Sequence, residues 1–203
     1  TPFYDFCVSH GTKEALFKGH LIEQAQLQPG FRVLDVGCGT GTLLLMIKER
    51  YAEVEAVGID GDPKILAIAR RKSEVKGAEI RFHHALAQDL PFENASFDRV
   101  FTSLVLHHLT ADQKRAALKE IYRVLKRGGE MHVADWGVPH SLLMKIAFQM
   151  VRMLDGYSMT EDNYRGRLPT LFAEDGFIEA KERARFATLF GTLSLFSARK
   201  GGA

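Results

Sequence analysis

Short apolar runs alternate with amphipathic stretches along the first two thirds of the chain. The apolar runs predict buried strands at 32–36, 56–60, 79–83, 97–103 and 130–135. The stretches between them have helical spacing and predict helices at 12–27, 42–50, 63–75 and 111–126. Pro63 stands at a favoured first-turn position, and Gly128-Gly129 end the last of these helices. This alternation predicts a parallel sheet with helices on both faces.

The last third of the chain has a looser pattern. It predicts helices at 141–154 and 166–174, and two closing strands at 177–184 and 187–198 around Phe190-Gly191.

The helix at 141–154 has an unusually wide apolar arc. Its polar side consists of Lys145, Gln149 and Arg152, which share one narrow face by the helical period. So wide an arc needs cover on two sides. We expect the sheet on one side, and on the other a lid, a lipophilic acceptor, a membrane surface or a second subunit.

Composition and charge narrow the class of protein. The chain has 203 residues, the size of one ordinary domain. Its 27 basic and 25 acidic side chains give a net charge of +2, which offers no electrostatic footprint for nucleic acid. The chain has two cysteines, and no apolar run is long enough to span a bilayer. The N-terminus lacks the features of a signal peptide, so we expect a cytoplasmic location.

A glycine-rich turn follows the first strand, in the segment Val33–Thr42. Gly37, Gly39 and Gly41 form G-x-G-x-G between a strand and a helix, where a ligand can approach the main chain closely. Thr42 stands where a dinucleotide fingerprint needs its last glycine, and no lysine is present for a P-loop. Asp60 ends the second strand, where an acidic side chain can accept hydrogen bonds from a ribose.

These segments together resemble the class I S-adenosylmethionine-dependent methyltransferases, and most of all the bacterial menaquinone and ubiquinone C-methyltransferase group. The resemblance runs from about Phe3 to Asp135 and is carried by VLDVGCGTG, GID, LPFENASFD, LVLHHL and EIYRVLKRGGEMHVAD. It implies a Rossmann-like α/β fold, with a seven-stranded sheet of order 3-2-1-4-5-7-6 whose last-numbered strand is antiparallel. It also implies S-adenosylmethionine as cofactor and S-adenosylhomocysteine as product.

The resemblance also assigns cofactor-binding residues. The amino-acid end of the cofactor is expected at Asp35, Gly37, Cys38, Gly39 and Gly41, with Cys38 as a small packing residue. Asp60 and the following Gly61 are expected at the ribose. Leu86 replaces the Asp usual in the adenine segment, which leaves the backbone of Ala87 and the side chain of Gln88 as candidates.

Ser103 to His108 follow the fourth strand, at the edge where open α/β sheets bind ligands. Ser103 and His108 are expected to contact the cofactor, and His107 is a candidate base. Tyr4, in a segment that closes over the cofactor in similar enzymes, and Asp135 are the other catalytic candidates, and Tyr4 is also expected at the cofactor. The histidine pair lacks a recognisable ligand set in the sequence, so no metal is expected.

The predicted protein is therefore a methyltransferase with a single domain over 1–203. Residues 1–29 are expected to form an N-terminal cap segment, and 136–174 a lid on the acceptor side, with Trp136, Tyr157 and Tyr164 beside the acceptor. The acceptor is expected to be small or lipophilic: a quinone precursor, a phospholipid amine or a small metabolite. A nicotinamide-dependent oxidoreductase and a cofactor-binding scaffold without catalysis are the alternatives.

Overall fold

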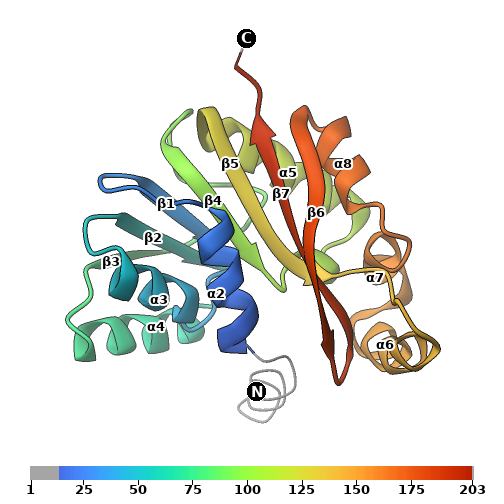
Figure 1. Ribbon diagram of the computed structural model, residues 1–203. Coiled ribbons are helices and arrows are strands. Elements are labelled where there is room, and N and C mark those ends of the chain that lie inside the picture. The colour runs from blue at the N-terminus through green and yellow to red at the C-terminus, as the bar shows by residue number, and fades with distance from the viewer. Residues whose placement is uncertain (1–13, 203) are drawn as a thin grey trace.

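A seven-stranded sheet forms the centre of the computed structural model, which describes residues 14–202 (Figure 1). The strands are β1 (Arg32–Val36), β2 (Glu55–Asp60), β3 (Ile80–His84), β4 (Phe97–Ser103), β5 (Leu125–Trp136), β6 (Phe177–Thr188) and β7 (Gly191–Lys200). Their order in space is β3-β2-β1-β4-β5-β7-β6, as the sequence predicts. Neighbouring strands are parallel except that β7 is antiparallel to both β5 and β6. The Rossmann-like class I methyltransferase fold is confirmed.

Helices cover both faces of this sheet. They are α2 (Glu14–Gln24), α3 (Thr42–Arg50), α4 (Pro63–Val75), the 3₁₀ turn η1 (Leu106–His108), α5 (Ala111–Val124), α6 (Leu142–Asp155), α7 (Tyr157–Tyr164) and α8 (Leu168–Glu174). α2, α3 and α4 lie on one face and α5 and α8 on the other, while α6 and α7 lie at the side of the fold (Figure 1). Alternate strand residues enter the two cores: Val33 packs with α2 and α3, and Leu34 packs with α5.

Local sequence signals fix the starts of three helices. The Asp62 side chain caps α4 by accepting a hydrogen bond from Lys64 N, with Pro63 in the first turn. Thr110 and Gln113 form a capping box at the start of α5. The Ser141 hydroxyl caps α6 by accepting from Met144 N. These caps set the helix directions from residues that are visible in the sequence.

The largest boundary differences from the prediction lie in β5 and in the closing hairpin, where β6 continues to Thr188. Helix α5 ends at Val124, two residues early, and β5 begins at Leu125 because this residue pairs with Phe97. Gly128, with φ of 71°, lies in an irregularity of β5 before regular pairing resumes. The closing hairpin turns at Leu189 and Phe190, so β7 begins later than predicted.

The prediction for the helix at 141–154 is wrong in one respect. Arg152 is buried rather than part of an exposed polar face. Its guanidinium donates a hydrogen bond to Glu161, with a donor–acceptor distance of 2.5 Å. The same group lies over the rings of Tyr157 and Tyr164, 4.8 Å and 4.4 Å from their centroids. The buried side of α6 therefore contains a paired charge, and most of its apolar side chains face outward.

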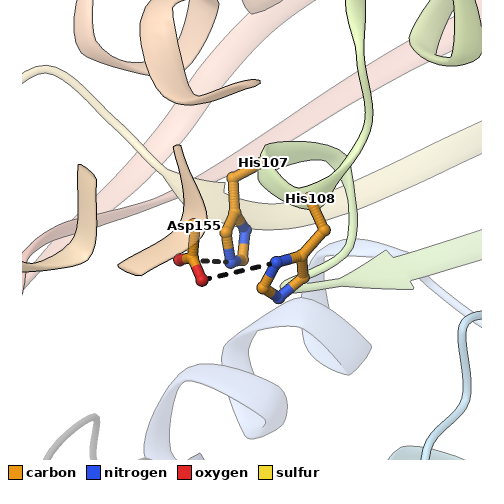
Figure 2. A group of neighbouring side chains, drawn as sticks. All are labelled: His107, His108 and Asp155. Atoms are coloured by element: carbon orange, nitrogen blue, oxygen red, sulfur yellow. Dashed lines mark ion pairs between the residues drawn. The ribbon is translucent and has the colours of Figure 1, made fainter. Parts of the chain in front are cut away.

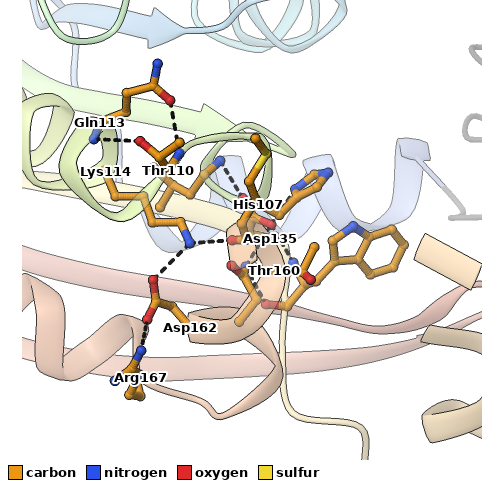
Figure 3. A network of polar contacts seen from close by, with 12 residues as sticks. His107, Thr110, Gln113, Lys114, Asp135, Thr160, Asp162 and Arg167 are labelled. Carbon is orange, nitrogen blue, oxygen red and sulfur yellow. Dashed lines mark hydrogen bonds and ion pairs between the residues drawn. The ribbon is translucent and has the colours of Figure 1, made fainter. Parts of the chain in front are cut away.

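Helix α7 was not predicted, because its buried positions are polar. Thr160, Asp162 and Asn163 are buried on it, so the helix has no apolar periodicity. Asp162 accepts from Lys114 Nζ at 3.0 Å and from Arg167 at 2.5 Å, which fastens α7 to the start of α5 (Figure 3). No helix among residues 14–202 is long and apolar enough to cross a membrane.

Candidate functional site

The glycine turn between β1 and α3 has one open position. Gly37, Gly39 and Gly41 have φ of 71°, 54° and 77°, a region that other residues resist. A Cβ on Gly37 would collide with Val105, and one on Gly41 would lie 3.2 Å from Phe82. A Cβ on Gly39 would meet nothing within 4 Å. The outer glycines are thus needed for packing, whereas Gly39 borders free space in which a ligand can reach the backbone.

Asp60 joins this turn to the end of β2. Its Oδ2 accepts a hydrogen bond from Gly39 N at 2.9 Å, and its Oδ1 accepts from Asp62 N at 2.9 Å. Each oxygen keeps a further lone pair, so the carboxylate can also accept from two hydroxyls of a ligand. The structure therefore places Asp60 where the sequence predicts a ribose acceptor, and gives it a second task in shaping the turn.

Asp35 is a buried carboxylate near the end of β1, two residues before Gly37. Its side chain is 2% exposed, and Oδ1 has no hydrogen-bond partner among the described residues. Burial raises the pKa of Asp35 from 3.8 to about 7, although the nearby Lys18 lowers it. A vacant acceptor on a buried acid suits a ligand that brings a donor or a positive charge.

Cys38, next to the turn, has a packing role. Its side chain is buried, and a Cβ on Gly58 would lie 2.9 Å from Sγ. Burial raises the pKa of the Cys38 thiol, so the reactive thiolate form is disfavoured.

The segment after β3 runs beside Asp60. Ala85 N donates to Asp60 O at 3.2 Å, and a Cβ on Gly61 would lie 3.0 Å from the exposed Leu86. Ala87 and Gln88 follow, both half-buried. These three predicted contacts, Gly61, Ala87 and Gln88, thus lie along one edge with the glycine turn.

A buried histidine–aspartate pair lies at the ends of β4 and β5 (Figure 3). His107 Nδ1 is 2.7 Å from Asp135 Oδ1, and His107 is 1% exposed. Asp135 also accepts from Leu106 N, Trp136 N and Asn163 Nδ2, at 2.8, 2.7 and 3.0 Å. Burial alone would raise the pKa of Asp135, but His107 and the hydrogen bonds hold it below its usual value.

Asp155, at the end of α6, faces both histidines (Figure 2). Its two oxygens lie 3.6 Å from His107 Nε2 and 3.6 Å from His108 Nδ1. Burial lowers the pKa of His108, and the neighbouring His107 lowers it further. Ligand atoms of the three residues all lie within 4.8 Å of one another, so the group can hold either a proton or a divalent cation.

Ser103 and Leu104 connect β4 to this group. Ser103 is half-buried, and Leu104 has a left-handed φ of 58° that is costly for leucine. A hydrogen bond from Leu104 N to Ala134 O, 2.8 Å long, holds the strained residue in place. Tyr4 lies outside the described residues.

Comparison with known proteins identifies the family of this chain. Residues 33–129 match the model of a methyltransferase domain. The chain is 43% identical over 124 residues to demethylmenaquinone methyltransferase of Thermus thermophilus, covering 59% of this chain and 56% of that protein. It is 33% identical over 196 residues to the ubiquinone/menaquinone biosynthesis C-methyltransferase UbiE of Xanthomonas oryzae, covering 86% of this chain and 75% of that protein.

The chain belongs to this methyltransferase family. A solved structure agrees on the fold: phosphoethanolamine N-methyltransferase 2 of Haemonchus contortus, bound to phosphomonomethylethanolamine and S-adenosylhomocysteine. It has a TM-score of 0.74 and 18% identity, over 92% of this chain and 53% of that chain. Membership confirms the predicted cofactor, S-adenosylmethionine, and removes the nicotinamide alternative.

The residues of the methyltransferase fit that cofactor. Gly39 leaves the backbone open, Asp60 has spare lone pairs beside the turn, and Asp35 has a vacant buried oxygen. Asp35, Gly39 and the neighbouring turn residues would hold the amino-acid end, and Asp60 with Gly61 the ribose.

Replacing Asp60 with alanine is expected to weaken S-adenosylhomocysteine binding by about 1–3 kcal/mol, because hydrogen bonds to a charged acceptor are lost. Asp60→Asn keeps one acceptor oxygen and serves as the milder variant. Isothermal titration of both folded proteins measures the effect. Wild-type affinity in the alanine variant would remove Asp60 from the site.

Asp35→Asn is expected to stabilise the ligand-free methyltransferase while weakening cofactor binding. Because the folded pKa of about 7 lies above the ordinary 3.8, the native state binds the extra proton, and wild-type stability falls as pH rises between these values. The variant should gain up to about 4 kcal/mol at pH 8 and clearly less at pH 5, at about 1.4 kcal/mol per pKa unit. Urea denaturation of the wild type and the variant at both pH values tests this. An equal change in the free energy of unfolding between pH 5 and pH 8 in the two proteins would contradict it.

Proposed function

We propose that this chain transfers a methyl group from S-adenosylmethionine to a ring carbon of a quinol precursor. The observation that carries the proposal is the buried Asp135–His107 pair at the same sheet edge as the glycine turn. The named relatives, a demethylmenaquinone methyltransferase and a ubiquinone/menaquinone C-methyltransferase, support the acceptor class.

A ring carbon of a quinol becomes a strong nucleophile when a neighbouring hydroxyl loses its proton. The cofactor, when bound, supplies an electrophilic methyl group on a sulfonium sulfur. The protein must then accept the hydroxyl proton, orient the ring and exclude water. After the methyl group has been added, the ring carbon loses its own proton to solvent, and the hydroxyl proton returns to the oxygen, which restores the aromatic quinol. With Nδ1 donating to Asp135, His107 has its lone pair on Nε2, and that atom accepts the proton.

Asp135 acts through His107 and is a positioning residue. It is fully buried and surrounded by four donors, so it fixes the tautomer and the ring orientation without touching the acceptor. Asp155, 3.6 Å from Nε2, stabilises the imidazolium that forms. The His108 side chain is 45% exposed on the other side of Asp155, and we propose that it contacts the cofactor.

Helices α6 and α7 form the lid over this site, whereas α8, within the predicted lid segment 136–174, packs on the sheet through Leu168 and Phe172. Trp136 packs against Phe148, with ring centroids 5.7 Å apart, and Phe148 stacks on Tyr164 at 6.2 Å. Trp136 Nε1 is buried and has no hydrogen-bond partner among the described residues, so it can donate to a ring oxygen of the acceptor. His107 is covered by Asp155, and the acceptor enters when the end of α6 moves about Gly156, whose φ is 98°.

The proposal predicts that a reduced demethylated naphthoquinol or benzoquinol is methylated and that the oxidised quinone is not, because only the quinol has an ionisable hydroxyl. Mass spectrometry of reactions under anaerobic conditions measures this. Phosphoethanolamine is the control for an amine acceptor. Turnover of phosphoethanolamine but not of quinols would overturn the acceptor class, and no turnover of any acceptor would support the non-catalytic scaffold.

A further inference from the structure

Helix α6 presents an apolar surface to the outside of the molecule. We call it the α6 apolar face, and its side chains are between 61% and 76% exposed: Leu142, Leu143, Ile146, Met150, Met153 and Leu154. The opposite side of the helix is anchored by the buried Phe148 and Val151. An exposed apolar surface of this continuity is unusual on a protein that has no partner for it.

The hairpin that joins β6 and β7 extends this surface. Its tip contains Leu189, which is 76% exposed, and a Cβ on the following Gly191 would lie 3.1 Å from Phe148 of α6. The hairpin tip and α6 are neighbours at the edge of the fold (Figure 1). Two separate elements therefore offer exposed aliphatic side chains on one side of the molecule.

The one exposed charged side chain of α6 is a cation. Lys145 is exposed on α6 and has no acidic partner among residues 14–202. The single acid of α6, Asp155, points inward to the histidines, and Glu161 of α7 is paired with Arg152 and Arg165. The outer surface of α6 is thus aliphatic and cationic, without a free carboxylate.

This chemistry suits a lipid surface better than a protein. Protein interfaces contain about one hydrogen bond per 100–200 Å² and are enriched in aromatic residues, methionine and arginine, whereas four of the six side chains of the face are Leu or Ile and none of the six is aromatic or charged. Amphipathic helices bind in the plane of a bilayer through their buried apolar area, and each cation near an anionic surface adds a smaller electrostatic attraction, so here the apolar face supplies most of the binding and Lys145 adds to it. Tyr157, half exposed at the start of α7, adds the amphipathic ring common at such interfaces.

We propose that the α6 apolar face, together with the β6–β7 hairpin tip, docks this protein on the surface of an anionic lipid bilayer. The same helix ends at Asp155, beside His107 and His108, so docking brings the acceptor side of the site to the membrane. If the proposed function holds, an acceptor with an apolar tail passes from the bilayer to the site along α6. The docking proposal itself depends only on the α6 apolar face and the hairpin tip, and not on the proposed function.

Vesicle sedimentation with the full chain tests the docking, without methyl donor or acceptor present. The wild type should bind vesicles of equal phosphatidylglycerol and phosphatidylcholine, and Leu143→Ser/Met150→Ser/Met153→Ser should bind at least tenfold more weakly. Ile68→Ser/Val75→Ser, two exposed apolar residues of α4, is the matched control and should bind as wild type does. Lys145→Glu should weaken binding to these anionic vesicles and leave binding to vesicles of pure phosphatidylcholine unchanged.

Two results would overturn the docking: no vesicle binding by the wild type, or equal binding by the triple variant. Light scattering measures the oligomeric state and so tests whether a second copy of the chain occupies the face. A wild-type dimer that becomes a monomer in the triple variant would assign the face to that second copy. The triple variant should keep wild-type affinity for S-adenosylhomocysteine, which shows that it is folded. Vesicle binding without any quinol turnover would refute the proposed function and leave the docking intact.

Discussion

Gly39→Val is expected to reduce affinity for S-adenosylmethionine at least about 100-fold, a loss of about 2.7 kcal/mol or more. A Cβ at this position meets no protein atom within 4 Å, so a branched side chain would project into the space left for the cofactor. The left-handed φ of 54° adds a folding cost of about 1–2 kcal/mol. The variant should therefore be folded, slightly destabilised and unable to bind, as titration calorimetry and thermal denaturation will measure.

Gly77→Val is the matched control for this variant. Gly77 has nearly the same φ, 61°, and equally free space, but it lies at the end of α4 away from the glycine turn. It should lose the same stability and keep wild-type affinity. Normal binding by Gly39→Val would show that the turn is only structural, and equal loss of binding in both variants would trace the effect to folding.

His107→Gln is expected to lower turnover by about 10²–10⁴-fold, the usual contribution of a positioned general base. Glutamine keeps a donor for Asp135, so the buried carboxylate stays paired and the protein folds. Affinity for S-adenosylhomocysteine should change less than about threefold, since His107 lies on the acceptor side. Steady-state kinetics with a quinol acceptor, together with titration of the product, separate the two effects.

His132→Gln controls for the loss of a buried histidine from the same region. His132 is fully buried on β5, three residues before Asp135, where it contacts Gln24. Its replacement should cost about 1–3 kcal/mol of stability and leave turnover per folded molecule unchanged. Unchanged turnover in His107→Gln would remove His107 as the base. Loss of wild-type activity on dialysis against EDTA, with recovery on adding a divalent metal, would make the histidine group a metal centre.

The sheet and the cofactor side were predictable because their signals are local. Apolar runs specify buried strands, and the order of strands and helices specifies a parallel sheet. The glycine spacing from Gly37 to Gly41 requires left-handed backbone angles that the structure shows. Asp60 was found because an acid that ends the neighbouring strand must lie at the same sheet edge.

The acceptor side was only partly predictable because it is assembled by long-range contacts. Asp155 and Asn163 reach the His107–Asp135 pair from α6 and α7, and nothing near them in the sequence marks them as site residues. Arg152 was misplaced because helical periodicity treats a charge as exposed, whereas here Glu161 and two tyrosine rings neutralise and cover it.

The site contains two locally unfavourable features, although Gln26, Ala95 and Glu179 elsewhere in the fold also have a positive φ. Asp35 is an acid in a buried position, and Leu104 has a left-handed backbone conformation. Such features persist where the surrounding structure enforces them, and they are typical of functional sites. Their position at the ends of β1 and β4 agrees with ligand binding at this edge of the sheet.

The central claim is methyl transfer to a ring carbon of a quinol, and one labelling measurement tests it most directly. The wild-type protein is incubated anaerobically with a demethylated quinol and S-adenosylmethionine that has ¹³C in its methyl group, and the product is analysed by carbon NMR. We predict a single labelled methyl group bonded to a ring carbon, and its absence with Gly39→Val. A label on oxygen, or no label in any quinol product, would contradict the account.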